Sequence, residues 1–221
     1  MTKKIFILAV SIFIFIFCTS FVGPSYKMAR LKYGGGGDWY SSRTALNNLI
    51  EFCNEELNTN FFTTEAIVES GSSEIFNYPY VFATGHGNIV FSDDEALNLR
   101  TYLSTGGFLH ICDNYGMNNY VRLAMKKVFP DKEFVELPYS HPIFQKPYSF
   151  PNGLPKIHEH DGKRPQAFGI IIDGRLVCLF DYECDLGNGW EDIGTYPTDT
   201  KETHDKALKM GANIIHYILT N

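Results

Sequence analysis

Three polar turns of the sequence carry residue types that could hold a small molecule. Each turn follows a short apolar run and brings glycine, histidine or a carboxylate to the end of that run. Glycine lets backbone amides approach a ligand closely, and an amide-lined turn ahead of a helix favours an anion or a developing oxyanion. The residues are Gly34, Gly35, Gly36, Gly37, Asp38 and Trp39 in the first turn, Gly85, His86 and Gly87 in the second, and Asp113 and Asn114 in the third.

Each turn also has a purely structural interpretation. The glycines at 34–37 match neither the dinucleotide fingerprint nor a phosphate-binding loop, so a flexible turn is one alternative. Asp113 and Asn114 are residue types that often cap the next helix. His86 stands between glycines rather than among apolar neighbours. We therefore favour a functional role for His86 and leave both interpretations open for the other turns.

Cys112 ends an apolar run ahead of a turn and a helix, which is the place that a nucleophile elbow occupies. The small residues that flank such an elbow are absent, since His110 stands two positions earlier. Strand alternation puts both side chains on one face, which favours packing. Catalysis therefore stays an alternative, either with a Cys112 nucleophile or with His86 or His141 as base and Asp113 orienting it.

Two further polar clusters lie toward the C-terminus. The segment His-Glu-His-Asp at 158–161 has no standard metal-ligand spacing, so we interpret it as a solvated loop and predict no metal site. Three acids then alternate along the chain and repel one another unless a positive group meets them. A solvent-facing edge is the alternative. The acids are Asp181, Glu183 and Asp185, and the candidate partners are a cation, Arg122 or Arg164.

The elements that must position these residues alternate between apolar runs and amphipathic stretches. This alternation predicts strands that cross over through helices onto a parallel sheet. We expect strands at 29–33, 60–69, 80–84 and 108–112. We expect helices from Ser41 or Ser42 to about 57, from a capping box of Ser92 and Glu95 to about 103, around 121–128, and over 203–219.

The second half of the chain adds a hairpin and a long loop. Asp173-Gly174 is the strongest short-range turn signal of the sequence and predicts a hairpin over 167–183. Six of the ten prolines lie between residues 137 and 165, which predicts an ordered loop rather than a regular element. We find no internal repeat and no low-complexity linker.

The N-terminus has the order of a secretory signal. Two lysines precede an apolar run at 5–17, and small residues follow it. Extended to Val22, the run reaches the lower limit of a membrane span, so an uncleaved anchor is the alternative. We therefore expect residues 1–23 to be a signal peptide or signal anchor. Residues 28–221 are expected to form one exported domain, periplasmic or extracellular.

Composition restricts the partners. Hydrophobic residues make up 44 % of the chain, which is enough for a packed core. The formal charge of −6 and the absence of a long basic run exclude an electrostatic footprint for nucleic acid. The expected partners are a small polar ligand or another envelope protein, with the membrane met only through the N-terminal segment. We expect Cys53, Cys112, Cys178 and Cys184 to pack rather than to form disulfides.

Five collinear segments resemble the bacterial domain-of-unknown-function family 4159. They are RLKYGGGGDWY at 30–40, TGHGNIVFSDDE at 84–95, LRTYLSTGGFLHICDN at 99–114, LPYSHPIF at 137–144 and IDGRLVCLFDYECDLGNGWE at 172–191. Members of this family look related to the class I glutamine-amidotransferase-like superfamily. The resemblance implies an α/β fold, a flavodoxin-like three-layer sandwich with a mostly parallel central sheet, to which the C-terminal hairpin is added.

The resemblance also marks the positions that recur in these segments. A glutaminase needs a downstream His-x-Glu, which does not follow the histidines at 158 and 160, so amidotransferase activity is not implied. The positions that the resemblance points to are Gly35, Gly36, Asp38, Trp39, His86, Gly87, Asp113, His141, Asp185, Gly187, Trp190 and Glu191.

These observations lead to one expectation and two alternatives. We expect a domain that binds a small polar or anionic ligand, such as a sugar, at the carboxyl edge of its sheet, with no cofactor specified. Aromatic faces and carboxylates are what a polyhydroxylated ring needs, and Trp39 could supply such a face. The alternatives are a hydrolase or amidase that uses His86 with Asp113 or Cys112, and an envelope scaffold or assembly protein.

Overall fold

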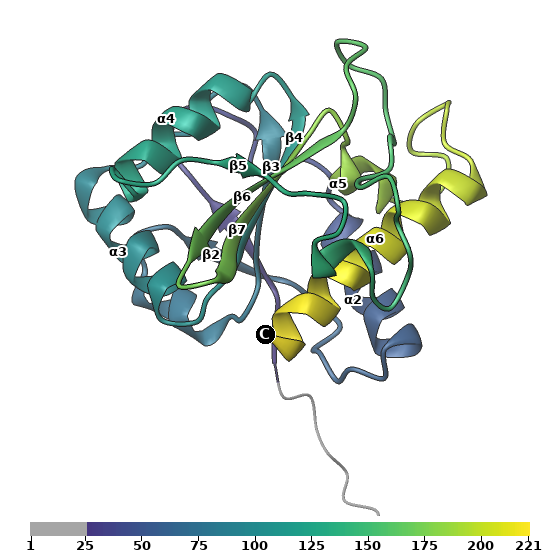
Figure 1. Cartoon of the computed structure of the whole chain (residues 1–221), viewed down its shortest axis with the longest axis horizontal. Coiled ribbons are helices and arrows are strands. Elements are labelled where there is room, and N and C mark those ends of the chain that lie inside the picture. The colour runs from purple at the N-terminus through teal and green to yellow at the C-terminus, as the bar shows by residue number, and fades with distance from the viewer. Residues whose placement is uncertain (1–25) are drawn as a thin grey trace, which may run out of the picture.

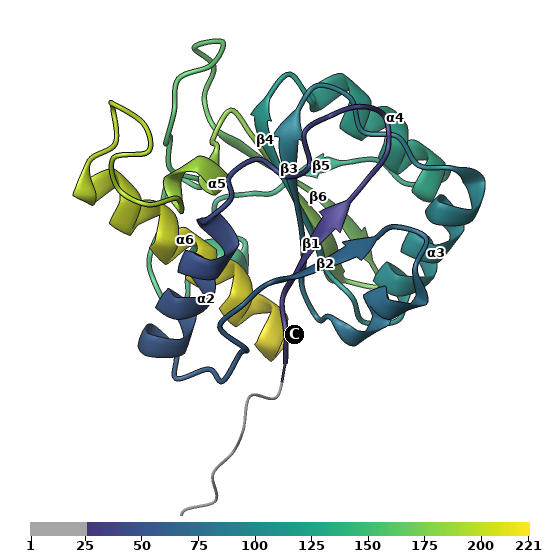
Figure 2. The ribbon, with the colours of Figure 1, turned by 180° about the vertical axis from the view of Figure 1, so that it is seen from behind.

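The computed structural model describes residues 26–221, which form one seven-stranded sheet with helices on both faces (Figures 1 and 2). The strands are β1 (Ala29–Lys32), β2 (Ala66–Glu69), β3 (Val81–His86), β4 (Leu109–Tyr115), β5 (Val135–Glu136), β6 (Gln166–Ile172) and β7 (Arg175–Tyr182). The helices are α2 (Ala45–Glu56), α3 (Asp93–Ser104), α4 (Asn118–Val128), α5 (Leu186–Gly189) and α6 (Lys201–Thr220), with 3-10 turns η1 (Ser73–Asn77) and η2 (Pro142–Phe144). The signal or anchor predicted at 1–23 lies outside the described residues.

The strand order is β2-β1-β3-β4-β7-β6-β5. The first five strands are mutually parallel, and β6 and β5 continue the sheet in antiparallel pairs. The parallel part has the order 2-1-3-4-5 of flavodoxin-like proteins. The expected α/β sandwich with a mostly parallel sheet and an added hairpin is therefore confirmed.

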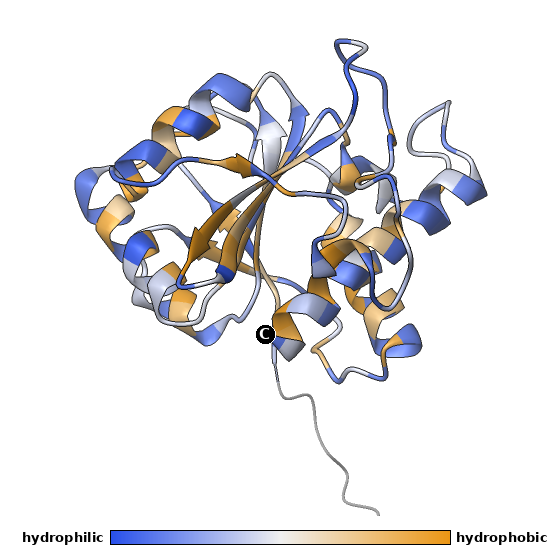
Figure 3. Ribbon diagram, in the orientation of Figure 1, coloured by the Kyte–Doolittle hydropathy of each residue, from blue (hydrophilic) through white to orange (hydrophobic). Residues whose placement is uncertain are grey.

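Two apolar cores lie on the two faces of the sheet. Helices α2 and α6 cover one face, and α3 and α4 cover the other (Figures 1 and 2). The central strands are apolar along most of their length, because residues of a parallel sheet are buried on both faces (Figure 3). Among the described residues, no helix is long and apolar enough to cross a membrane.

Local signals predicted two features of the fold correctly. The Ser92 hydroxyl accepts from the Glu95 amide (3.2 Å), and the Glu95 carboxylate accepts from the Ser92 amide (2.7 Å), so the capping box is confirmed. Asp173 and Gly174 both have positive φ angles (49° and 82°), which the tight turn of the β6–β7 hairpin requires.

Two predicted boundaries are wrong for reasons that lie far away in the sequence. Ser42 does not cap helix α2, because it adopts a left-handed conformation (φ 50°) and its hydroxyl donates to Asn188 instead. The helix begins after Thr44, whose side chain makes no cap hydrogen bond. The strand predicted at 60–69 shrinks to β2, since Phe61 makes only an isolated bridge.

Candidate functional site

The ends of β3 and β4 meet the segments that follow β1 and β7 at the carboxyl edge of the sheet through a chain of buried hydrogen bonds. Asn114, on β4, accepts from the Thr84 hydroxyl (2.7 Å) and donates to Ser42 Oγ (3.1 Å). Ser42 Oγ donates to Asn188 Oδ1 (2.9 Å), and the Asn188 amide donates to Asp185 Oδ2 (2.7 Å). This network joins positions 146 residues apart and holds the edge in one arrangement.

Asp185 and the two histidines that contact it connect two further segments to this edge. Asp185 is 1 % exposed and adopts a left-handed conformation (φ 63°) that non-glycine residues rarely take. Its Oδ2 lies 3.2 Å from His158 Nδ1 and 3.3 Å from His160 Nε2. His158 Nε2 meets Asp199 Oδ1 at 2.9 Å. The Asp185 carboxylate therefore holds the proline-rich loop directly, and His158 links that loop to the segment before α6.

The two histidines supply positive charge to the edge. The hydrogen bond to Asp185 raises the pKa of His158 to about 9 against the opposing effect of burial, and Asp199 adds to the rise. The same carboxylate raises the pKa of His160. Both side chains are mostly buried, at 14 % and 9 % exposure. The interpretation of 158–161 as a solvated loop holds for the exposed Glu159 and Asp161. It is wrong for the two histidines, which turn inward onto Asp185.

Asp113 is a buried carboxylate with a single hydrogen bond. Its Oδ1 accepts from the amide of Met117, the residue before α4, at 2.9 Å, whereas α4 itself has no side-chain cap. Burial, together with the charges of Asp181 and Asp185, raises the pKa of Asp113 to about 6, against the opposing effects of the Met117 hydrogen bond and His160. Within residues 26–221, Oδ2 accepts no hydrogen bond.

A cavity of 260 Å³ opens between the ends of β4 and β7. The chain leaves β4 toward α4 on one face of the sheet and leaves β7 toward α6 on the other face. The cavity lies between these two diverging loops. Apart from one glycine, every lining side chain carries a polar atom. The lining residues are Asp113, Tyr115, Gly116, Asn118, Asn119, His160, Asp161, Lys163, Tyr182 and Glu183.

Glu183 is a second buried carboxylate of this cavity, and it has partners. Lys156 Nζ lies 2.8 Å from its Oε2, and the Asp161 amide donates to its Oε1 (3.2 Å). Burial raises the pKa of Glu183, but the Lys156 ammonium and the Asp161 amide outweigh this and lower it overall. Glu183 therefore stays ionised, whereas the neighbouring Asp113 titrates near neutrality.

Neither of the arginines predicted as partners meets the three acids. Asp181 lies 2.9 Å from His110, while Lys156 and the two loop histidines meet the other two acids. Arg122 stacks over the Phe168 ring, with 4.4 Å between its guanidinium carbon and the ring centre. Arg164 forms an ion pair with Glu136. The two arginines are therefore held by side chains of the hairpin and of β5.

A second polar group, the His86–Asp38 pair, lies at the end of β3. Asp38 Oδ1 accepts from the His86 amide (2.5 Å), and Oδ2 lies 3.0 Å from His86 Nδ1. The imidazole is about half exposed, and within residues 26–221 its Nε2 has no hydrogen-bond partner. The glycines make room for this pair: a Cβ on Gly37 would come within 2.9 Å of the His86 carbonyl, and one on Gly85 would overlap the Tyr33 hydroxyl.

The polar turns therefore lie side by side, but they form two groups. Gly85 pairs with Asp113 across β3 and β4, which places the His86–Asp38 pair one strand from the cavity. His86 and the glycines at 34–37 do not line the cavity, whereas Asp113 does. Trp39 is half-buried beside the pair, with its ring edge-on to Tyr40 at 5.7 Å.

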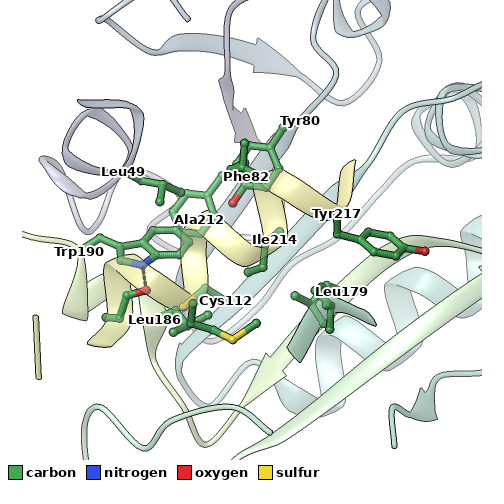
Figure 4. Close-up of a cluster of buried hydrophobic side chains, with 14 of the residues drawn as sticks. Leu49, Tyr80, Phe82, Cys112, Leu179, Leu186, Trp190, Ala212, Ile214 and Tyr217 are labelled. Atoms are coloured by element: carbon green, nitrogen blue, oxygen red, sulfur yellow. Dashed lines mark hydrogen bonds between the residues drawn. The ribbon is translucent and has the colours of Figure 1, made fainter. Parts of the chain in front are cut away.

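Two of the expected ligand-binding residues lie elsewhere. Trp190 is fully buried, 5.3 Å from the Phe82 ring centre, and its indole donates to the Ala207 carbonyl (2.8 Å; Figure 4). It supports the edge from the core instead of contacting a ligand. His141 packs on Tyr217, whose hydroxyl accepts from the Leu176 amide at the amino end of β7. His141 is therefore at the opposite edge of the sheet.

Cys112 is in the core under the site. Its side chain is fully buried in a hydrophobic cluster (Figure 4). The sulfur accepts from the Gly187 amide (3.1 Å) and lies 3.9 Å from Asp185 Oδ1. Burial, with the charges of Asp181 and Asp185, raises the pKa of the thiol well above its usual range. A thiolate nucleophile does not fit this position. The four cysteines of the described residues are free and buried, as predicted.

A buried triad lies deeper still and has no access to a ligand. His110 contacts Asp181 through Nε2 (2.9 Å) and the Tyr80 hydroxyl through Nδ1 (2.8 Å), and none of the three residues is more than 1 % exposed. Among residues 26–221, no group of three or more His, Cys, Asp or Glu side chains has a geometry that could hold a metal ion.

Several residues of the edge were missed in the sequence. Ser42, Asn188 and Asp199 carry no motif, and only the fold shows that they meet. The His-x-His spacing of His158 and His160 was the one available signal, because alternate residues of an extended segment reach the same side.

One comparison with known proteins identifies the family. A family model described as "Domain of unknown function (DUF4159)" matches residues 27–219, nearly the whole of the described chain. A search of curated proteins finds no match. The match covers β1 through α6, with both polar groups of the carboxyl edge inside it. The chain therefore belongs to the DUF4159 family, a domain of unknown function.

Proposed function

We propose that this domain binds a small polyhydroxylated ligand, such as a monosaccharide, in the cavity between β4 and β7. The observation that carries the proposal is Asp113. This carboxylate is 2 % exposed and lines the cavity, yet its Oδ2 accepts no hydrogen bond within residues 26–221. Since Asp113 lines the cavity, a ligand hydroxyl can donate a hydrogen bond to this oxygen. A hydrogen bond to a charged group contributes about 1.5–3 kcal/mol.

The rest of the lining supports this ligand class. Sugar hydroxyls both donate and accept, and the wall offers acceptors on Glu183 and donors on Lys163 together with the amides of Asn118 and Asn119. The phenol ring of Tyr115 can cover the apolar face of a sugar. The volume of 260 Å³ is below the roughly 300–1,000 Å³ of sites for drug-sized ligands, so a single ring is favoured over a nucleotide.

Calorimetric titration of the full chain with a panel of neutral and acidic monosaccharides tests the proposal. We expect at least one neutral sugar to bind, and Asp113→Asn to weaken binding about tenfold or more, because a charge-assisted hydrogen bond is lost. Asp131→Asn, at an exposed position after α4, is the matched control and should bind like the parent. Absence of heat with every sugar, or equal affinity of the two variants, contradicts the proposal.

The His86–Asp38 pair favours a second candidate, a hydrolase. A neutral imidazole that donates Nδ1–H to Asp38 leaves Nε2 basic and free toward solvent. In such a reaction a water molecule gives a proton to Nε2 as its oxygen attacks the carbonyl carbon, and the electrons of the C=O π bond move to the carbonyl oxygen. When the C=O bond re-forms, the bond to the alcohol or amine breaks, and the leaving group takes the proton from Nε2. The pair lies where β1 and β3 separate, the switch point at which open α/β sheets bind ligands. Hydrolysis of small ester and amide substrates, lost in both His86→Gln and Asp38→Asn, is the test.

Two further alternatives stay predictions. The flavodoxin-like strand order supports a relation to the class I glutamine-amidotransferase-like superfamily, but the buried Cys112 does not favour its glutaminase chemistry. The envelope-scaffold interpretation is tested by capturing partners with His86→Ala. If that variant still captures the partner, the partner binds at a surface other than the glycine turns.

A further inference from the structure

The amino edge of the sheet carries an exposed aromatic patch, formed by Tyr26, Phe62 and Phe76. These side chains are 55 %, 46 % and 45 % exposed. The backbone ties two of them together, since the Phe62 amide donates to the Tyr26 carbonyl at 3.0 Å. Tyr26 and Phe76 also line one hollow of 270 Å³. Large aromatic side chains that gather on one exposed surface usually mark a contact.

The hollow beside this patch has an uncharged lining. Its remaining walls are aromatic, proline, glycine and neutral polar residues: Asn77, Tyr78, Pro79, Tyr102, Thr105, Gly106 and Gly107. At its border, Arg175 donates to the carbonyls of Gly106 (3.4 Å) and Gly107 (3.1 Å), and Glu74 on η1 is the acid nearest in sequence to Phe76. Aromatic side chains that combine an apolar ring with a polar tip are enriched at the headgroup level of a bilayer. The tyrosines and phenylalanine around this uncharged hollow, with a guanidinium at its rim, fit that region.

The chain that leads into this edge indicates which surface covers it. The described chain begins at Tyr26, beside the carboxyl end of α6 in both views and opposite the ends of β3 and β4 (Figures 1 and 2). The apolar run of the sequence, extended to Val22, ends four residues earlier. Four residues span at most about 14 Å, so an inserted run holds Tyr26 close to the headgroups.

We propose that the amino edge of the sheet, marked by Tyr26, Phe62 and Phe76, rests on the bilayer that holds the chain's own N-terminal apolar run. The proposal takes that run as an uncleaved anchor. In this orientation the carboxyl edge, with the cavity and the His86–Asp38 pair, points away from the membrane into the aqueous compartment. A soluble ligand then reaches the cavity without obstruction by lipid.

The experiment uses the full chain in phosphatidylcholine vesicles whose acyl chains carry bromine, a short-range quencher of tryptophan fluorescence. Phe76→Trp places a reporter in the patch. Tyr120→Trp is the matched control, because Tyr120 is 42 % exposed but lies in the first turn of α4, at the carboxyl edge. Trp39 and Trp190 contribute the same background to both variants and are subtracted with the parent protein.

We expect brominated lipid to remove more than half of the emission added at position 76 and little of that added at position 120. Equal quenching at the two positions, or none at position 76, overturns the proposal and leaves the patch to a protein partner. A chain that washes off the vesicles, whether by cleavage or by failure to insert, overturns it as well. Binding of a sugar in the cavity, measured by calorimetry, does not depend on any of these outcomes.

Discussion

Replacing Asp113 by Asn should stabilise the domain at neutral pH while weakening its proposed binding of a sugar. Asn keeps an acceptor for the Met117 amide but cannot ionise, so the variant isolates the charge. Burial raises the pKa of Asp113 from 3.8 to about 6. Each pKa unit corresponds to about 1.4 kcal/mol, so ionising this group in the folded state costs roughly 3 kcal/mol.

The sign follows from proton binding. Between the unfolded pKa of 3.8 and the folded pKa of about 6, the native state binds more protons than the unfolded state, so stability falls as the pH rises. From about pH 4 to about pH 8 the parent should lose about 2.5 kcal/mol relative to Asp113→Asn, since part of the titration precedes pH 4.

Urea denaturation of both proteins at several pH values measures this difference directly. Subtracting the two curves cancels the titration of the other groups, provided that these are unchanged. Asp131→Asn, the exposed control, should follow the parent throughout. Parallel stability curves for Asp113→Asn and the parent would refute the reasoning, because they would mean that Asp113 is solvated in the folded protein.

Further predictions follow from other contacts. Trp190→Ala removes a fully buried ring and should reduce the free energy of unfolding by about 3–5 kcal/mol; a loss below about 1 kcal/mol in urea denaturation contradicts its place in the core. Ser92→Ala breaks the capping box and should cost about 1 kcal/mol, seen as a lower midpoint of thermal unfolding. Iodoacetamide should leave Cys112 unlabelled in the folded protein and label it in urea, and rapid labelling when folded would restore the thiol alternative. His158 should titrate near pH 9 by NMR; the stability it contributes is complete below its unfolded pKa of 6.5 and is lost as the pH rises through about 9.

Much of the fold follows from local patterns. The apolar runs that became β3 and β4, the capping box at Ser92 and the Asp173-Gly174 hairpin depend on neighbours within a few positions, and all were predicted. The buried cysteines also followed from composition and spacing. The boundaries that failed, at Ser42 and at 60–69, are those where a distant partner replaces the local preference.

By itself, the sequence determined that glycine, histidine and acidic residues end parallel strands, and therefore that they gather at one edge of a sheet. Only the tertiary structure decided which of them meet. His86 pairs with Asp38 rather than Asp113, and two loop histidines close on Asp185, 25 and 27 positions away. These pairings depend on burial and on a left-handed backbone at Asp185, which residue types and periodicity do not encode.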